Sequence, residues 1–143
     1  MPSLDDTDPA CGSSQNLYDY AIIIPVYNPS EKFQLFIENL CARAHVENCL
    51  VILINDGCDD RFSSAFAALS MLDVVRLFQH ESNLGKGAAL KTGFAVLAKS
   101  FPYIKGALTA DADGQHSIND IFAVLKEGQG EHDSLTLGTR DFD

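Results

Sequence analysis

The feature of this chain that most constrains its fold is an alternation of short apolar runs with stretches of helical periodicity. The apolar runs occupy residues 21–26, 49–54, 73–78, 105–110 and 134–138. Between them, at 33–40, 62–69, 87–99 and 118–125, apolar residues recur at the spacing of one helix face. Short continuous apolar runs are typical of strands buried on both faces. The alternation therefore predicts an α/β fold, a three-layer sandwich built on a mostly parallel, doubly wound sheet.

Length and charge limit the domain organisation and the partners. The chain has 143 residues, with twenty Asp and Glu against ten Lys and Arg, and a net charge of −10. This length favours one domain. We expect it to cover residues 20–143, behind a flexible N-terminal tail at 1–19 that is rich in Ser, Asp, Pro and Gly. The acidic balance argues against nucleic acid as a partner.

Nothing in the chain predicts a membrane span or a secretory signal. No run of about 18 apolar residues occurs, and the first residues are acidic where a secretory signal is basic. The four cysteines, Cys11, Cys41, Cys49 and Cys58, lack metal-ligand spacing. Together these features favour reduced thiols and a cytoplasmic location.

Polar residues that could bind a ligand or take part in a reaction cluster directly after the predicted strands. In open parallel sheets, ligands bind in the crevice beyond the carboxyl ends of the strands. The clusters are Pro25-Val26-Tyr27-Asn28, Asn55-Asp56-Gly57, Asn83-Leu84-Gly85-Lys86-Gly87 and Asp111-Ala112-Asp113-Gly114-Gln115-His116. We therefore expect these four segments to meet at one edge of the sheet.

The cluster after the fourth run contains two carboxylates, Asp111 and Asp113. In an extended segment, residues two apart point to the same side, and paired carboxylates repel unless a cation lies between them. Mg²⁺ or Mn²⁺ accepts such oxygen ligands, and Gln115 could add a carbonyl oxygen. The alternative is a solvated acidic turn before the next helix. For His116, a polar role beside that helix is favoured over metal binding.

The segment 83–87 favours anion binding. Two glycines allow a ligand close to the backbone, and Lys86 begins a predicted helix, whose N-terminus attracts anions. The alternative is a plain loop with a solvated lysine. The segment does not fit a P-loop, because that motif needs Gly where His80 stands and Ser or Thr where Gly87 stands.

Two further residues could contact a nucleotide. Asp56 could accept hydrogen bonds from a base or ribose, although an Asp-Gly turn at Asp56-Gly57 explains it equally well. Tyr27 could stack on a base, or could pack partly into the core. His45, His80 and His132 have no partner visible in the sequence, and we assign them no role.

Taken together and in order, these segments resemble family 2 glycosyltransferases of the GT-A fold. The matching strings are IPVYN at 24–28, NDGC at 55–58, NLGKG at 83–87, DADGQH at 111–116 and GTR at 138–140. DADGQH is most similar to the polyprenyl-phosphate (dolichyl-phosphate) hexosyltransferase branch. The resemblance covers about residues 20 to 143.

The resemblance implies a donor site for a UDP- or GDP-hexose. It implies that Pro25, Tyr27 and Asp56 line the nucleoside pocket, that Lys86 meets the diphosphate, and that Asp111 and Asp113 hold Mg²⁺ or Mn²⁺, with Gln115 completing the metal shell. The nucleotide-sugar-binding set implied in full is Pro25, Val26, Tyr27, Asn28, Asp56, Gly57, Lys86, Asp111, Ala112 and Asp113. One departure is Asn55-Asp56-Gly57-Cys58, where the family usually has Asp-Asp-Gly-Ser.

The resemblance also implies that the chain is the donor-binding half of a longer enzyme. The acceptor half and the catalytic base are expected beyond residue 143, so no catalytic residue is assigned. The parent would transfer hexose with inversion to a polyprenyl phosphate or another glycan acceptor, at the cytoplasmic face of a membrane. This chain alone would bind nucleotide and show little or no transfer. The alternatives are a nucleotidyltransferase and a non-catalytic domain that keeps the fold to bind a protein partner.

Overall fold

The computed structural model describes residues 18–114 and 117–128 of the chain. In chain order the elements are β1 (Tyr20–Val26), α1 (Phe33–Val46), β2 (Cys49–Asp56), a 3₁₀ turn η1 (Asp60–Phe62), α2 (Ser63–Ser70), β3 (Val75–His80), α3 (Lys86–Ser100), β4 (Gly106–Thr109) and α4 (Ile118–Gly128). Each apolar run and each periodic stretch up to residue 125 therefore corresponds to an element of the predicted type. The fifth predicted strand, at 134–138, lies outside the described residues.

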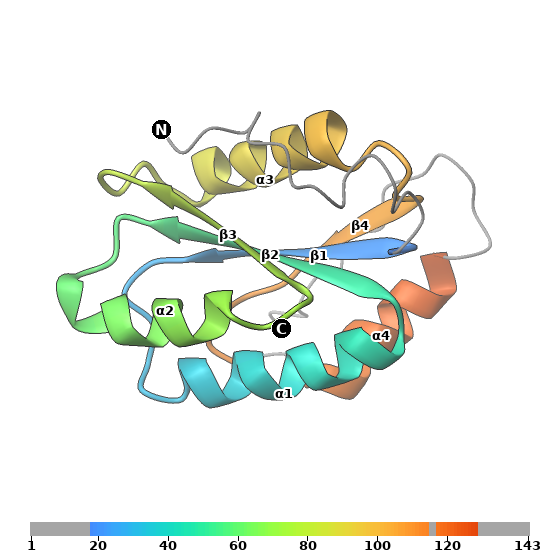
Figure 1. The fold of residues 1–143 in the computed structure, drawn as a ribbon, viewed down its shortest axis with the longest axis horizontal. Helices are drawn as coiled ribbons and strands as arrows, with labels where there is room; N and C mark the ends of the chain where they lie inside the picture. The colour runs from blue at the N-terminus through green and yellow to red at the C-terminus, as the bar shows by residue number, and fades with distance from the viewer. Residues whose placement is uncertain (1–17, 115–116, 129–143) are drawn as a thin grey trace, which may run out of the picture.

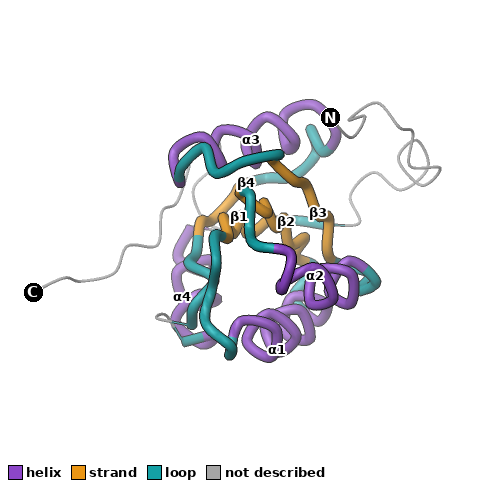
Figure 2. The backbone as a smooth tube through the Cα atoms, turned by 90° about the vertical axis from the view of Figure 1, so that its left-hand side faces the viewer, coloured by secondary structure: helices purple, strands orange, loops and turns teal. Residues whose placement is uncertain are grey.

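The four strands form one parallel sheet in the order β3-β2-β1-β4. Helix α3 covers one face, and α1, α2 and α4 cover the other (Figure 1). Figure 2, turned by 90°, shows the same arrangement as three layers with the strands in the middle. The predicted α/β sandwich with helices on both faces of a parallel sheet is confirmed.

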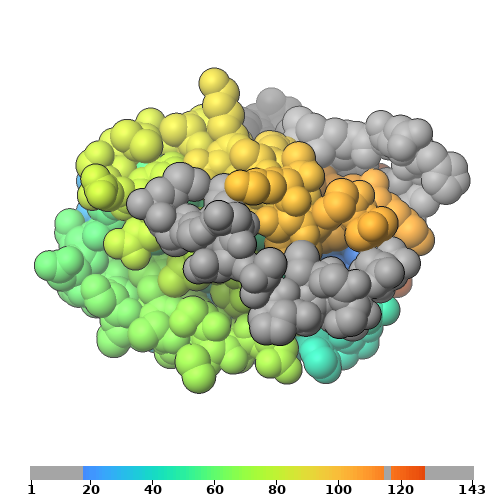
Figure 3. All heavy atoms as spheres, turned by 45° about the horizontal axis from the view of Figure 1, so that its top comes forward, coloured from blue at the N-terminus to red at the C-terminus, as the bar shows by residue number. Residues whose placement is uncertain are grey.

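Side chains along the central strands alternate between two cores. Ile22 and Ile24 of β1 belong to the cluster beneath α1, α2 and α4, and Ala21 and Ile23 belong to the cluster beneath α3. All four are fully buried. This two-residue period explains why the strand sequences are continuously apolar, since neither face meets water. In the space-filling view of Figure 3, α3 (yellow) is bordered by the segment that leads into β4 (orange).

β2 and β3 each extend two residues beyond the predicted ends of their apolar runs. β2 continues through Asn55 and Asp56, and β3 runs over 75–80 rather than 73–78, so that it ends at His80. These polar ends remain in the ladder because Asn55 pairs with Gln79 and Asp56 pairs with His80. Apolar patterning could not reveal the extension, because pairing of the backbone does not depend on an apolar side chain.

The last two residues of the predicted tail are anchored to the sheet. Asp19 donates its N–H to Asn48 O and accepts from Lys105 N, both at 2.9 Å. Tyr18 Oη donates to Asp73 O at 3.3 Å. Among the described residues, Cys41, Cys49 and Cys58 are free thiols, and no helix combines the length and hydropathy that crossing a membrane requires.

Candidate functional site

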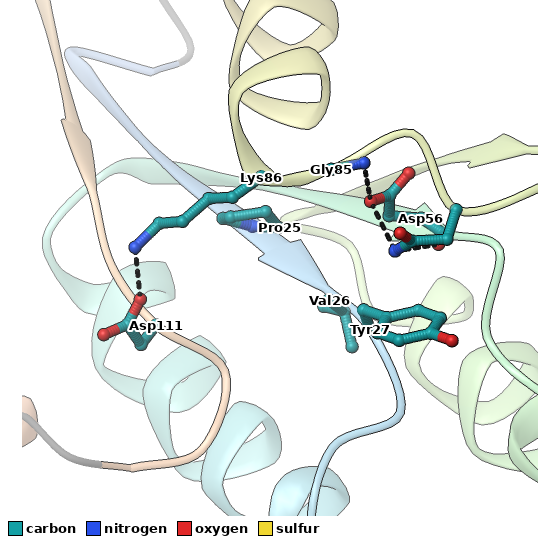
Figure 4. Close-up of a pocket in the computed structure, with 8 residues that line it drawn as sticks. Pro25, Val26, Tyr27, Asp56, Gly85, Lys86 and Asp111 are labelled. Atoms are coloured by element: carbon teal, nitrogen blue, oxygen red, sulfur yellow. Dashed lines mark hydrogen bonds and ion pairs between the residues drawn. The ribbon is translucent and has the colours of Figure 1, made fainter.

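A pocket lies at the carboxyl ends of the strands, where the sheet order changes direction. The chain moves outward from β1 through β2 to β3, and then returns to place β4 on the other side of β1. Crevices at such reversals are the usual ligand sites of open α/β sheets. The pocket has a volume of about 350 Å³ and is lined by Pro25, Val26, Tyr27, Asp56, Asn83, Gly85, Lys86 and Asp111 (Figure 4).

The pocket gathers residues from all four predicted clusters, which come from loops that are far apart in the chain. Of the predicted nucleotide-sugar-binding residues, Pro25, Val26, Tyr27, Asp56, Lys86 and Asp111 line it. Asn28, Gly57, Ala112 and Asp113 do not line it. Gln115 and the GTR string at 138–140 lie outside the described residues, so the predicted metal role of Gln115 stays a prediction.

The segment that follows β1 presents one aromatic ring to the pocket. Val26 is buried in the core, whereas Tyr27 is 54% exposed. This exposure favours the ligand-facing alternative for Tyr27 over core packing. Its ring lies next to Val26 and below Asp56 in the close-up (Figure 4). Stacking of a base on this ring stays a prediction.

Lys86 and Asp111 face each other across the pocket. Lys86 is the first residue of α3, and its Nζ lies 3.1 Å from Asp111 Oδ1, just beyond β4. Figure 4 shows the lysine chain reaching past Pro25 to this carboxylate. The lysine side chain is 65% exposed and the aspartate side chain 32% exposed. An exposed pair of this kind is worth at most about 1 kcal/mol, so an anion or a cation can displace it at little cost.

Asp56 is buried and its carboxylate is fully engaged by the chain itself. Oδ1 lies 2.7 Å from His80 Nδ1 and accepts from Leu84 N at 2.9 Å. Oδ2 accepts from Asn83 Nδ2 at 3.0 Å and from Gly85 N at 2.9 Å. A carboxylate offers about four acceptor sites, and these contacts use that number. Asp56 thus anchors the 83–85 loop to the sheet, and its predicted contact with a nucleoside stays a prediction that requires one of these bonds to yield.

Gly57 makes room for the same loop. Its φ of +77° is a conformation that side chains with a Cβ rarely adopt, and an added Cβ would lie 2.4 Å from both Asn83 N and Ser82 C. The backbone of residues 82–83 therefore passes directly against Gly57. The glycine of the predicted Asp-Gly turn shapes the pocket without lining it.

Asn28 and Cys58 join the loops after β1 and β2. Asn28 N donates to Cys58 Sγ at 3.3 Å, and Asn28 Oδ1 accepts from Asp59 N at 2.9 Å. The Cys58 thiol in turn donates to Val26 O at 3.3 Å. Burial raises the pKa of the Cys58 thiol, which favours the protonated form that this donation needs. Cys58 therefore supplies a hydrogen-bond donor at the position of the serine in the Asp-Asp-Gly-Ser string of the family that the sequence resembles.

Directly after Asp111 the chain forms a turn at Ala112 and Asp113 rather than an extended strand. The extended backbone on which the expected alignment of Asp111 with Asp113 depends is therefore absent, and Asp113 is exposed and does not line the pocket. Within the described residues, no cluster of three or more acidic, histidine or cysteine side chains could hold a metal ion. Mg²⁺, however, is commonly held by one or two carboxylates together with water and substrate phosphate, and the oxygen donors of Asp111 suit that chemistry.

Sequence reasoning did not assign a role to His80, although its partners turn out to be close. His80 Nδ1 contacts Asp56, and Nε2 lies 2.8 Å from Thr92 Oγ1. His80 therefore has two partners that the sequence does not reveal. The missed signal was positional, because His80 ends β3 beside the end of β2. Asn83 and Gly85 were recognised within a motif but not as pocket-lining residues.

Comparison with known proteins gives a family for this arrangement. Residues 21–143 match the family described as glycosyl transferase family 2. An uncharacterized protein of Methanocaldococcus jannaschii is 27% identical over 122 residues, covering 85% of this chain and 46% of that protein. A UDP-N-acetylglucosamine–dolichyl-phosphate N-acetylglucosaminyltransferase of Methanococcus voltae is 28% identical over 133 residues, covering 83% of this chain and 51% of that protein.

A second group of relatives matches a shorter part of the chain. An uncharacterized glycosyltransferase of Rickettsia felis is 38% identical over 73 residues, which is 51% of this chain and 12% of that protein. The chain spans about half the length of the two archaeal relatives. The family match covers every residue that lines the pocket and all of the sheet except Tyr20. This chain therefore belongs to glycosyl transferase family 2.

Proposed function

We propose that this chain binds a nucleotide-diphosphate sugar, a UDP- or GDP-hexose, in the pocket at the carboxyl ends of β1, β2 and β4. The observation that carries the proposal is the meeting of Lys86 and Asp111 in one pocket, 3.1 Å apart, beside the exposed ring of Tyr27. Cationic side chains and helix N-termini both stabilise a bound diphosphate, and the start of α3 at Lys86 offers both. A base can stack on an exposed aromatic ring.

The metal in this proposal is Mg²⁺ or Mn²⁺, held by Asp111, with Asp113 and Gln115 as the further predicted ligands. When bound, the ion would neutralise the charge of the leaving diphosphate. Lys86 and the N–H groups at the start of α3 would orient the same diphosphate from the other side. Tyr27 and Pro25 would hold the nucleoside.

We further propose that the whole protein is a hexosyltransferase that transfers its sugar with inversion to a polyprenyl phosphate or another glycan acceptor. The relative from Methanococcus voltae supports this class, since its name specifies a UDP-linked sugar donor and a dolichyl-phosphate acceptor. It also adds UDP-N-acetylglucosamine to the donors worth testing. The acceptor site and catalytic base would lie beyond residue 143, so this chain alone would bind the donor and show little or no transfer. The parent would work at the cytoplasmic face of a membrane.

The test is calorimetric titration of the chain with UDP, GDP, UDP-glucose, UDP-N-acetylglucosamine and GDP-mannose, each with Mn²⁺ and with EDTA. We expect the nucleotides of one base, uracil or guanine, to bind. Their affinity should fall at least about tenfold in EDTA, because a charge-assisted contact is worth about 1.5–3 kcal/mol. The nucleotide sugar that binds most tightly would then indicate which donor the protein uses.

Matched variants separate the site from a general charge effect. Asp111→Asn should reproduce the effect of EDTA, and Asp113→Asn measures the second predicted ligand. Asp59→Asn, which removes an exposed carboxylate outside the pocket, should bind as the unsubstituted chain does. A folded chain that binds none of these nucleotides would contradict the proposal and favour a partner-binding role for the fold.

A further inference from the structure

A buried polar network behind the pocket links β2, β3 and α3. Asp56 and His80 end adjacent strands and are paired in register, so their side chains leave the sheet on the same side. His80 lies between two partners, with Nδ1 2.7 Å from Asp56 Oδ1 and Nε2 2.8 Å from Thr92 Oγ1 of α3. The side chains of His80 and Asp56 are only 12% and 3% exposed. The contacts are therefore shielded from water. In such surroundings a hydrogen bond is electrostatically stronger than in water.

The hydrogen-bond roles in this network are set by its two ends. An ionised carboxylate only accepts, so Nδ1 of His80 carries a proton and donates it to Asp56. The Thr92 hydroxyl lies 3.1 Å from Ala88 O as well. The hydroxyl therefore has two possible hydrogen-bonding states: it donates to Ala88 O and accepts from Nε2, or it donates to Nε2. In both states Nδ1–H stays directed at Asp56.

Asp56 transmits this constraint to the loop before α3. The carboxylate accepts from the N–H groups of Leu84 and Gly85. Gly85 is the residue immediately before Lys86, which begins α3. The loop from His80 to Lys86 is thus fixed at three points, at the end of β3, at Asp56 and, through Thr92, at α3 itself.

We propose that His80 is a positioning residue for the nucleotide pocket: it orients Asp56, which holds the N–H groups of Leu84 and Gly85 and so places Lys86 opposite Asp111. The inference rests on the proposed function, because it assigns a purpose to the position of Lys86. It deepens that function by naming a residue that acts without touching the ligand. His80 lies outside the set that lines the pocket.

The first measurement needs no ligand. Hydrogen exchange at the Leu84 and Gly85 amides is followed by NMR in the 143-residue chain, since exchange reports local opening. His80→Leu should speed exchange at both amides about tenfold or more, because the buried carboxylate loses a partner. His80→Asn keeps an N–H donor at the δ position and should restore most of the protection. His80→Gln can reach Thr92 but not Asp56 from the δ position, and should resemble His80→Leu.

The second measurement separates positioning from general stability. UDP is compared with uridine, and GDP with guanosine, in each variant. If Lys86 is misplaced, the affinity for UDP or GDP should fall about tenfold, while uridine or guanosine should bind as before. His80→Asn should again restore the lost affinity. A merely structural role would lower both affinities together or neither.

The outcomes decide the two proposals separately. If the unsubstituted chain binds no nucleotide, the proposed function fails. The exchange rates at Leu84 and Gly85 still test whether His80 positions the loop. Unchanged exchange in His80→Leu, or equal losses in His80→Asn and His80→Leu, would overturn the positioning role. If His80→Leu does not fold, His80→Asn, His80→Gln and Thr92→Val are compared, and Thr92→Val should speed exchange by a smaller factor than His80→Gln.

Discussion

Lys86 and Asp111 are each other's counterion in the pocket, with Nζ 3.1 Å from Oδ1. The lysine is the group proposed for the diphosphate, and the aspartate is the group proposed for the metal. Each is therefore satisfied by the other until a ligand arrives. A divalent cation at Asp111 would repel the ammonium group, and the released lysine would then be free to meet the diphosphate.

Removing the lysine should have opposite effects on two ligands. In Lys86→Met, Mn²⁺ alone should bind up to about fivefold more tightly, because an exposed ion pair competes by at most about 1 kcal/mol. UDP or GDP with Mn²⁺ should bind at least about tenfold more weakly, because a charge-assisted contact is lost. Electron paramagnetic resonance measures free Mn²⁺, and calorimetry measures the nucleotide.

Lys91→Met is the matched control for Lys86→Met. Lys91 lies on the same helix, is exposed and does not line the pocket, so its removal changes net charge equally. It should leave both affinities unchanged. A Lys86→Met chain in which Mn²⁺ alone also binds more weakly would contradict the counterion role.

Substitution of Gly57 should destabilise the fold strongly. In Gly57→Ala the new Cβ meets the backbone of residues 82–83 at 2.4 Å, and the φ of +77° adds strain. We expect the free energy of unfolding to fall by about 2 kcal/mol or more, measured by urea denaturation. The 82–85 loop should also shift, which the amide chemical shifts of Leu84 and Gly85 would report.

Two other glycines separate strain from collision. Gly85 has a φ of +100° but nothing within 4 Å of an added Cβ, so Gly85→Ala tests strain alone. Gly87 lies in helix α3 with open space and no positive φ, so Gly87→Ala should raise the free energy of unfolding by up to about 1 kcal/mol. If Gly57→Ala lowered the free energy of unfolding no more than Gly85→Ala, the close approach of residues 82–83 to Gly57 would not contribute to the cost of the substitution.

The order of elements was predictable because strands buried on both faces leave continuous apolar runs. The ends of strands were less predictable. Asp56 and His80 belong to β2 and β3 through backbone pairing, and polar side chains at a ligand-facing edge interrupt the apolar pattern. Those two residues are also the ones on which the loop depends, so the sequence signal is weakest next to the site.

The location of the site was predictable from one rule, that ligands lie beyond the carboxyl ends of parallel strands. Six predicted residues line the pocket for that reason. Contacts within the site were not predictable in the same way. The meeting of His80 with Asp56 depends on the register between β2 and β3. The extended segment expected over Asp111–Asp113 is replaced by a turn.

The cap of helix α4 should contribute measurably to stability. Ser117 Oγ accepts from Asp120 N at 3.0 Å, which satisfies one of the backbone donors in the first turn of the helix. Ser117→Ala should lower the free energy of unfolding by about 1 kcal/mol, and Ser117→Asp, which keeps an acceptor, should retain most of it. Urea denaturation measures both. Equal stability of the alanine and aspartate variants would show that the bond contributes nothing.

Two buried thiols make stability depend on alkaline pH. Burial raises the pKa of Cys41 and that of Cys49 from 9.0 to about 12, with nearby Glu38 and Glu47 respectively adding to the effect. The unfolded chain therefore releases these protons at a lower pH than the folded chain does. The stabilising contribution is fully present below pH 9 and is lost as pH rises towards 12.

We therefore expect the free energy of unfolding to fall between pH 9 and 10, with a slope of up to about 1.4 kcal/mol per pH unit for each thiol. Urea denaturation at pH 7.5, 9 and 10 measures this slope. In the double variant Cys41→Ala and Cys49→Ala the chain is less stable at every pH, because two buried side chains are shortened, but its slope should be shallower. The comparison uses the slope, which the cavities do not change. Parallel pH curves for the two proteins would mean that the thiols do not titrate differently on folding.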